Sequence, residues 1–229
     1  RTIDNVLIQN CTISGSIGEG IALSGNSGDI VIDRCVIRDN EGDGILAQEV
    51  GATTLKLNLS SSIIETNGLG NSRNGVTYNI PNGSGLALYH NTFYNNAFLG
   101  LNIWTHSGEA TIVNNTFHAS THKTHLYTNV ALSGSSEISN NCFTEFGSSR
   151  WIINHNASNV FDSVSDFDSA YGFSSGNVGT TDPLLNSDLA LQSNASPCYQ
   201  AGKNATGITT DILGNNYRNP PSIGAYEYY

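Results

Sequence analysis

Short runs of alternating apolar and polar residues recur along most of the chain. Each run has two alternating apolar positions, a polar or Cys pair and one more apolar anchor, as in VLIQNCTI at 6–13 and IVIDRCVI at 30–37. The anchors recur every 24–29 residues, at Ile13, Ile37, Ile64, Phe93, Phe117 and Phe143. A period of two is that of a β-strand, and no helical period competes with it. The pattern predicts strands that recur once per repeat.

A second strand follows each anchor, usually after a glycine, as in GIAL at 20–23 and GLNI at 100–103. A single repeat of this length cannot bury its own apolar face, but coils stacked about 4.8 Å apart pair every strand with its copies. The sequence therefore predicts an all-β, right-handed parallel β-helix of about six coils with an irregular C-terminal cap. Two inward columns are expected: Ile21, Ile45, Val76, Leu101 and Leu126, and Ile8, Ile32, Leu59, Leu88, Ile112 and Ile138.

A third inward column is expected at a bend: Cys11, Cys35, Ser62, Asn91, Asn115 and Asn141. Stacked Asn side chains hydrogen-bond along such a column. Cys11 and Cys35 occupy neighbouring places in it, as two buried thiols or as a disulfide. Cys142 and Cys198 lie far apart in the sequence. Four cysteines allow three pairings, and the sequence does not select one.

The repeat weakens after Phe143, so we expect coils over 1–154 and, over 155–229, a last coil and a capping segment of the same domain. The tail contains DPLL at 182–185, SNASPCYQAG at 193–202 and DILGNNYRNPPSIGAYEY at 211–228. Repeat proteins need atypical terminal units, so the tail is assigned a structural role.

These motifs carry a family resemblance over nearly the whole chain. The tail resembles the closing segment of secreted microbial β-helix proteins, with patterns like DPLF, SPAIDAG and IGAYE, although Cys198, Tyr199 and Gln200 depart from it. The repeats resemble the parallel β-helix repeat family, and the Asn column resembles the ladder of pectate-lyase-like proteins. The resemblance implies a carbohydrate-centred protein, with polysaccharide lyases, hydrolases, archaeal disaggregatases and non-catalytic surface proteins among its relatives. Fold alone does not choose among them.

Charge and hydropathy limit the classes of partner that the chain is expected to bind. The formal net charge of −10 and the scattered Lys and Arg residues argue against a nucleic acid. No apolar run of 18 residues is present, so no membrane insertion is expected. Asn-x-Ser/Thr sequons give weak support for a secreted or cell-surface location. A homo-oligomer is left open.

Outward residues of the second strand predict a sugar-binding face. One outward row contains Asn102 and Tyr127, and the next contains Gln48, Asn79 and Trp104. Sugars stack on aromatic rings while their hydroxyl groups bond to amides. We name these five residues as candidate substrate contacts; the alternative places Trp104 under a loop.

The turn before this strand supplies candidate catalytic groups. A ladder of turn residues starts with Glu19 and Asp43, which should stack one coil apart. Like charges at about 5 Å need a cation or a shared proton, so the pair is a candidate Ca²⁺ site or acid/base pair. The alternative is a solvated turn with splayed carboxylates. Glu41, Arg73 and Lys123 complete the candidate catalytic set.

The sequence favours a secreted β-helix that degrades an extracellular polysaccharide by hydrolysis, because acidic residues outnumber basic ones near the predicted groove. A Ca²⁺-dependent polysaccharide lyase, with Lys123 or Arg73 as base, is one alternative. A non-catalytic carbohydrate-binding or adhesin module is the other.

Overall fold

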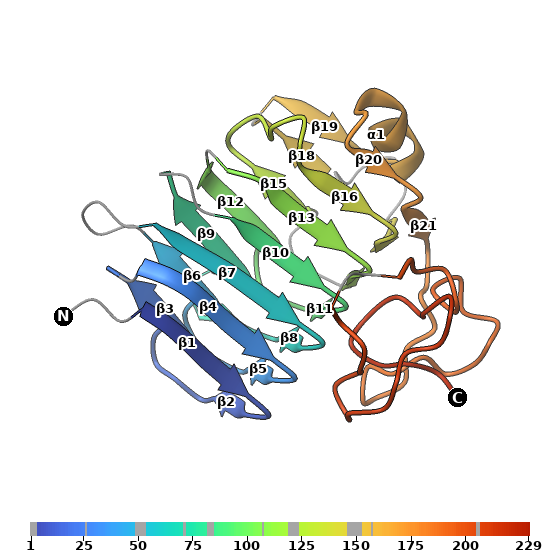
Figure 1. Cartoon of the computed structure of the whole chain (residues 1–229), viewed down its shortest axis with the longest axis horizontal. Helices are drawn as coiled ribbons and strands as arrows, with labels where there is room; N and C mark the ends of the chain where they lie inside the picture. Colours follow the sequence, from blue (N-terminus) through green and yellow to red (C-terminus); the bar gives the residue numbers. More distant parts are fainter. Residues whose placement is uncertain are drawn as a thin grey trace.

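The chain forms a parallel β-solenoid of three sheets in a computed structural model (Figure 1). The structure describes residues 4–25, 27–48, 54–70, 72–81, 85–106, 108–118, 124–145, 153–156, 158–204 and 207–229. Successive strands belong to sheets A, B and C in turn, so each coil contributes one strand to each sheet. This confirms the predicted parallel β-solenoid.

Sheet A contains seven strands, which in spatial order are β1 (Asp4–Gln9), β4 (Ser27–Asp33), β7 (Leu55–Ser60), β10 (Leu86–Tyr89), β13 (Ala110–Val113), β16 (Glu137–Ser139) and β20 (Ser174–Ser175). Sheet B contains β2 (Thr12–Ser14), β5 (Val36–Arg38), β8 (Ile63–Glu65), β11 (Thr92–Tyr94), β14 (Thr116–His118), β17 (Cys142–Thr144) and β21 (Val178–Thr180). Sheet C contains β3 (Ile21–Ser24), β6 (Ile45–Gln48), β9 (Val76–Ile80), β12 (Leu101–His106), β15 (Leu126–Thr128), β18 (Ile153–His155) and the antiparallel β19 (Asn159–Phe161).

The core consists of the columns that the sequence predicts. Ile21 pairs with Ile45, which pairs with Val76 in the next coil, and the column continues through Leu101 and Leu126. In sheet B the rings of Phe93 and Phe117 stack with centroids 4.6 Å apart. Stacking places like side chains above one another, so every coil covers the apolar face of its neighbours.

Asparagine side chains form the predicted ladder at the bend between sheets A and B. Asn91 Nδ2 donates to Asn115 Oδ1 at 2.9 Å, and Asn115 Nδ2 donates to Asn141 Oδ1 at 3.0 Å. The residue before each ladder position has a positive φ, as in Asn114 (60°) and Asn140 (52°), which produces the sharp bend.

A second ladder at the bend between sheets B and C was not predicted. Asn40 Nδ2 donates to Asn67 Oδ1 at 2.9 Å, and Asn67 Nδ2 donates to Asn96 Oδ1 at 3.1 Å. Again a left-handed residue precedes each position, such as Thr66 with φ of 50°. The two ladders fix both corners that flank sheet B.

The end of the stack is covered by α1 (Val164–Ala170) and β19 (Figure 1). Ser163 is the N-cap of α1, and Phe167 is fully buried in the main core. β20 and β21 then add one more rung to sheets A and B. The predicted last coil is therefore formed by residues after 155.

The described residues of the tail, 182–204 and 207–229, lie along the outer face of sheet B instead of across the end of the stack. Ala225 N donates to Thr92 Oγ1 at 3.0 Å, and Thr116 Oγ1 donates to the Ile223 carbonyl at 3.3 Å. Two small apolar clusters, around Cys142 and Ile63, join tail and sheet. The end of the stack is covered by α1 and β19 and not by the tail.

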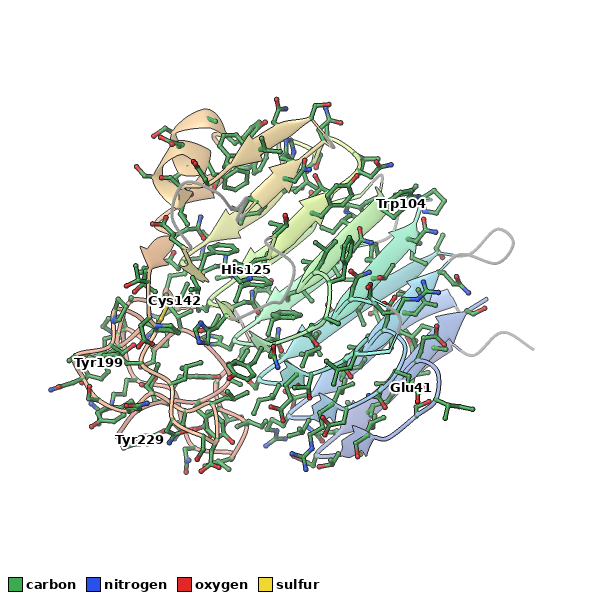
Figure 2. All side chains as sticks on the ribbon, turned by 180° about the vertical axis from the view of Figure 1, so that it is seen from behind. Glu41, Trp104, His125, Cys142, Tyr199 and Tyr229 are labelled. Carbon is green, nitrogen blue, oxygen red and sulfur yellow. A yellow bond between two sulfur atoms is a disulfide. The ribbon has the colours of Figure 1, made fainter. Side chains whose placement is uncertain are left out.

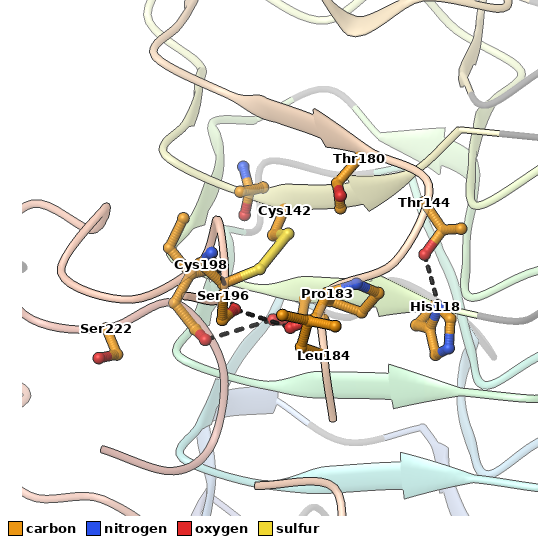
Figure 3. The surroundings of a disulfide bond; sticks show 12 residues. His118, Cys142, Thr144, Thr180, Pro183, Leu184, Ser196, Cys198 and Ser222 are labelled. Atoms are coloured by element: carbon orange, nitrogen blue, oxygen red, sulfur yellow. Dashed lines mark hydrogen bonds between the residues drawn. A yellow bond between two sulfur atoms is a disulfide. The ribbon is translucent and has the colours of Figure 1, made fainter. Parts of the chain in front are cut away.

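One disulfide fastens the tail to the stack, between Cys142 of β17 and Cys198, whose Cα atoms are 6.1 Å apart (Figure 3). Cys11 and Cys35 are free thiols, so the alternative of a disulfide between them is not what the structure shows. Cys35 is buried as expected, whereas Cys11 in the first coil is exposed. Burial raises the pKa of the Cys35 thiol.

Candidate functional site

The outer face of sheet C carries one continuous row of polar and aromatic side chains. Thr77, Asn102, Tyr127 and Asn154 are register partners in β9, β12, β15 and β18. Their neighbours along each strand point into the core, as the alternation predicts. Asn154 was not among the predicted contacts, although its place after the inward Ile153 was the signal that could have found it.

A hollow of about 290 Å³ lies on this face. We call it the sheet C hollow; its lining residues are Phe98, Leu99, Asn102, Trp104, Thr124, Tyr127 and Asn154. The rings of Trp104 and Tyr127 lie side by side, with centroids 6.3 Å apart and planes inclined by 25°. Trp104 is 48% exposed. The structure therefore places three of the five predicted substrate contacts, Asn102, Trp104 and Tyr127, around one hollow.

A β-bulge displaces Trp104 from the row in which the sequence placed it. Ile103 pairs with Tyr78, but the next pair is Thr105 with Asn79, so Trp104 is the extra residue. The expected register of Asn79 with Trp104 is wrong for this reason. Thr105 Oγ1 instead donates to Asn79 Oδ1 at 2.5 Å. Asn79 and its partner Gln48 lie outside the lining of the hollow.

Two amide oxygens at the hollow have no hydrogen-bond partner within the described part of the chain. They are Asn102 Oδ1 and Asn154 Oδ1, and both are buried. Because Tyr127 stands between these two residues in the row, the oxygens bracket its ring. An unpaired buried acceptor costs roughly 1–3 kcal/mol, so a ligand that donates to it recovers that energy.

The predicted turn ladder is present beside the hollow. Gly20 N donates to the Asp43 carbonyl, Gly44 N to that of Asn74, and Gly75 N to that of Leu99. Glu19, Asp43, Asn74 and Leu99 thus follow one another in successive coils. Leu99 lines the hollow, and Asp43 occupies the same ladder position two coils earlier. The distance along the stack from Leu99 to Asp43 is therefore on the order of 10 Å.

Asp43 is a buried carboxyl, 3% exposed. Its Oδ1 accepts a hydrogen bond from Asn74 N at 2.7 Å. Burial raises the pKa of Asp43, and Glu19 raises it further, whereas the Asn74 and Thr77 hydrogen bonds and the Arg73 charge oppose the shift. A solvated turn with splayed carboxylates therefore does not describe Asp43. Burial thus opposes the charged form of the Asp43 carboxyl, which is the form that a calcium ligand requires.

The remaining predicted groups are more dispersed. Glu19 is half-buried, and Glu41 and Arg73 are exposed. Figure 2 shows Glu41 well apart from Trp104 along the stack. Lys123 lies outside the described residues. Among the residues that the structure describes, no three His, Cys, Asp or Glu side chains are grouped as metal ligands, so a calcium ion at Glu19 and Asp43 would take its other ligands from carbonyl, amide or water oxygens.

Three parallel sheets wound into coils, with polar ladders at two corners, define a parallel β-helix protein. The chain belongs to the family described as right handed beta helix region, which matches residues 1–117. No curated protein sequence matches the chain. In the described residues, no helix combines the length and apolar character needed to cross a membrane.

Proposed function

We propose that this chain binds a polysaccharide along the outer face of sheet C. The observation that carries the proposal is the sheet C hollow, where two adjacent aromatic rings lie beside two unpartnered buried amide oxygens. A pyranose ring stacked on Tyr127 has hydroxyl groups on opposite edges. Rotation of the Asn102 and Asn154 amides towards the hollow brings their oxygens, which lack donors, within reach of those hydroxyls.

Hydrolysis of the bound polysaccharide is the reaction that we propose. A chain laid along the helix axis from the hollow passes Asp43 within about two coils. Asp43, whose pKa burial raises, is suited to donate a proton to the glycosidic oxygen, and Glu19 in the neighbouring coil is suited to act as the second carboxylate. Glu41 lies in the same turn as Asp43 and is the next candidate.

A calcium-dependent lyase is the first alternative. It would use Arg73 or Lys123 as base and calcium at Glu19 and Asp43. Arg73 is close enough to Asp43 for its charge to lower the carboxyl pKa, and this favours the alternative. Burial of the Asp43 carboxyl, which raises its pKa, counts against the alternative, because a calcium ligand must be the charged carboxylate. β-elimination creates an unsaturated product that absorbs in the ultraviolet, whereas hydrolysis does not.

A non-catalytic binding module is the second alternative. The observation in its favour is that Asp43 already accepts hydrogen bonds from Asn74 and Thr77, as a carboxyl with a purely structural role also would. A protein that binds the polysaccharide but releases no reducing ends would support the non-catalytic binding module.

The disulfide between Cys142 and Cys198 supports a secreted or cell-surface location for this proposed function, because disulfides persist in oxidising compartments.

The test is a polysaccharide panel assayed for binding and for reducing-sugar release, using the full chain and Trp104→Ala. We expect the variant to bind at least tenfold more weakly, because stacking on the aromatic pair is lost. Leu213→Ala, at an exposed apolar residue of the tail, is the matched control and should bind normally. Equal affinity of Trp104→Ala and the unaltered chain would remove the hollow as the binding site.

A further inference from the structure

A second concave surface lies on sheet A, away from the sheet C hollow. It has a volume of about 370 Å³ and lies over β10, between β7 and β13. Gly207 and Ile208 of the tail border it. We call it the sheet A groove. None of its lining residues lines the sheet C hollow.

Small residues in the middle coil form the floor of the groove. Ala87 stands between its register partners Asn58 and Thr111. Gly85 stands in the same way between Lys56 and Glu109, because Leu57 N donates to the Gly85 carbonyl and Leu86 N to that of Glu109. The two outer coils therefore rise as walls on either side of β10.

The Lys56 side chain lies across Gly85. A Cβ at residue 85 would come within 3.2 Å of Lys56 Cγ, so a larger residue there would push this side chain away from the floor. Lys56 runs from one wall in the direction of the other, where Glu109 stands. Both residues are exposed, and neither takes part in an ion pair with any residue that the structure describes.

The groove therefore presents hydrogen-bonding groups that are free to bind a ligand. Lys56 supplies N–H donors, Glu109 supplies acceptors, and Asn58 supplies both, with no hydrogen bond to described residues. Tyr89 adds a half-buried ring whose hydroxyl bonds to Thr111, and Ile208 adds an apolar edge. The opposite charges of Lys56 and Glu109 cancel, which selects against a ligand with net charge.

We propose that the sheet A groove is a second carbohydrate-binding site, which takes one neutral pyranose unit. Vicinal hydroxyls of a pyranose donate to the Glu109 carboxylate, the Lys56 ammonium donates to a hydroxyl or ring oxygen, and the carbon face of the ring lies against Tyr89. The volume lies within the range of small-ligand sites. Two sites on different faces let one chain hold a polysaccharide at two points or join two polysaccharide chains.

The test counts binding sites by calorimetry with a panel of neutral oligosaccharides on the full chain. Ala87→Phe fills the floor of the groove from an outward position. Leu7→Phe is the matched control, because Leu7 is exposed and precedes Val31, Asn58 and Ala87 in the same outward row. We expect two sites in the unaltered chain and in Leu7→Phe, and one in Ala87→Phe. Glu109→Gln should weaken the second site about tenfold while leaving the fold intact.

Trp104→Ala separates this proposal from that for sheet C. If Trp104→Ala still binds the sugar and the double variant Trp104→Ala/Ala87→Phe does not, the result supports the sheet A groove as a separate binding site. Loss of all binding in Trp104→Ala, or an unchanged site count in Ala87→Phe, overturns the groove and leaves the sheet C proposal standing. Binding that only Ala87→Phe removes supports the groove and overturns the sheet C hollow. Binding of a zwitterionic amino acid in place of the sugars would also overturn the assignment.

Discussion

Asn115 and Asn141 are joined by a hydrogen bond of 3.0 Å between Nδ2 of the first and Oδ1 of the second, one coil apart in the buried ladder. Asn115 Nδ2 also donates to the Leu88 carbonyl, and its Oδ1 accepts from the Asn91 main chain at 3.0 Å. We predict that Asn115→Ala lowers the free energy of unfolding by about 3 kcal/mol or more, because several buried groups lose partners at once. Urea denaturation measures this, with the exposed Asn159→Ala as control; a change below about 1 kcal/mol would show that the ladder contributes little.

The ladders also show how far the sequence determines this fold. Alternation and spacing predicted the three inward columns, because stacking repeats the same inward residue in each coil. The second ladder escaped prediction although Asn40, Asn67 and Asn96 recur at the repeat spacing, because no strand-like run marks that bend. The bulge at Trp104 was not predicted for another reason. An alternating pattern with a period of two does not indicate where a strand contains one extra residue.

The tail shows a similar limit. Its motifs indicated a structural role, but its position along sheet B depends on contacts between residues about 100 or more positions apart, such as Thr92 with Ala225. For the candidate site, aromatic and amide residues on one strand face predicted a sugar-binding face, and three of its five residues line the hollow. The burial of Asp43 could not be predicted, because it depends on how Asn74 and Thr77 of the next coil close over the turn.

Buried histidines should make the protein sensitive to acid. Burial lowers the pKa of both His90 and His125 to about 3. A folded pKa below the unfolded value of about 6.5 means that the unfolded chain binds more protons, so stability is complete above pH 6.5 and falls as the pH drops towards 3. At pH 5 each histidine should cost roughly 2 kcal/mol relative to neutral pH.

Urea denaturation at pH 7.5 and pH 5 measures the effect. His90 Nε2 lies 2.8 Å from Asn114 Nδ2, so a glutamine at residue 90 can keep an acceptor near Asn114 while removing the titration. We expect His90→Gln to show a smaller difference between the two pH values than the unaltered chain. An identical difference in both proteins would mean that His90 does not titrate in this range on unfolding.

The disulfide between Cys142 and Cys198 should stabilise the attachment of the tail. It spans 56 residues of sequence, and closing a loop of that length in the unfolded chain contributes roughly 4 kcal/mol by the chain-entropy model. We predict that Cys198→Ser lowers the free energy of unfolding by about 2–4 kcal/mol. Cys11→Ser is the control, since Cys11 is exposed and free. If the two variants unfold at the same urea concentration, the tail is held by its other contacts alone.

Asp43 provides the sharpest test of the proposed chemistry. Its pKa is raised because burial disfavours the charged carboxylate, so the folded state gains stability as the pH falls through that pKa. Asparagine at residue 43 removes the charge but keeps an oxygen that can accept from Asn74 N. Asp43→Asn should therefore be at least as stable as the unaltered chain at pH 7, and this advantage should shrink towards pH 4.

If Asp43 is the proton donor in hydrolysis, the same substitution should lower the rate of reducing-sugar release at least a hundredfold, because general acid catalysis is lost. Binding at the sheet C hollow should stay within about twofold, since that hollow is two coils away. The control is Asp29→Asn, which neutralises an exposed carboxylate of β4 on sheet A, outside the proposed catalytic set. An Asp43→Asn protein that is more stable and fully active would assign Asp43 a structural role, and Glu19 and Glu41 would be the carboxylates to change next.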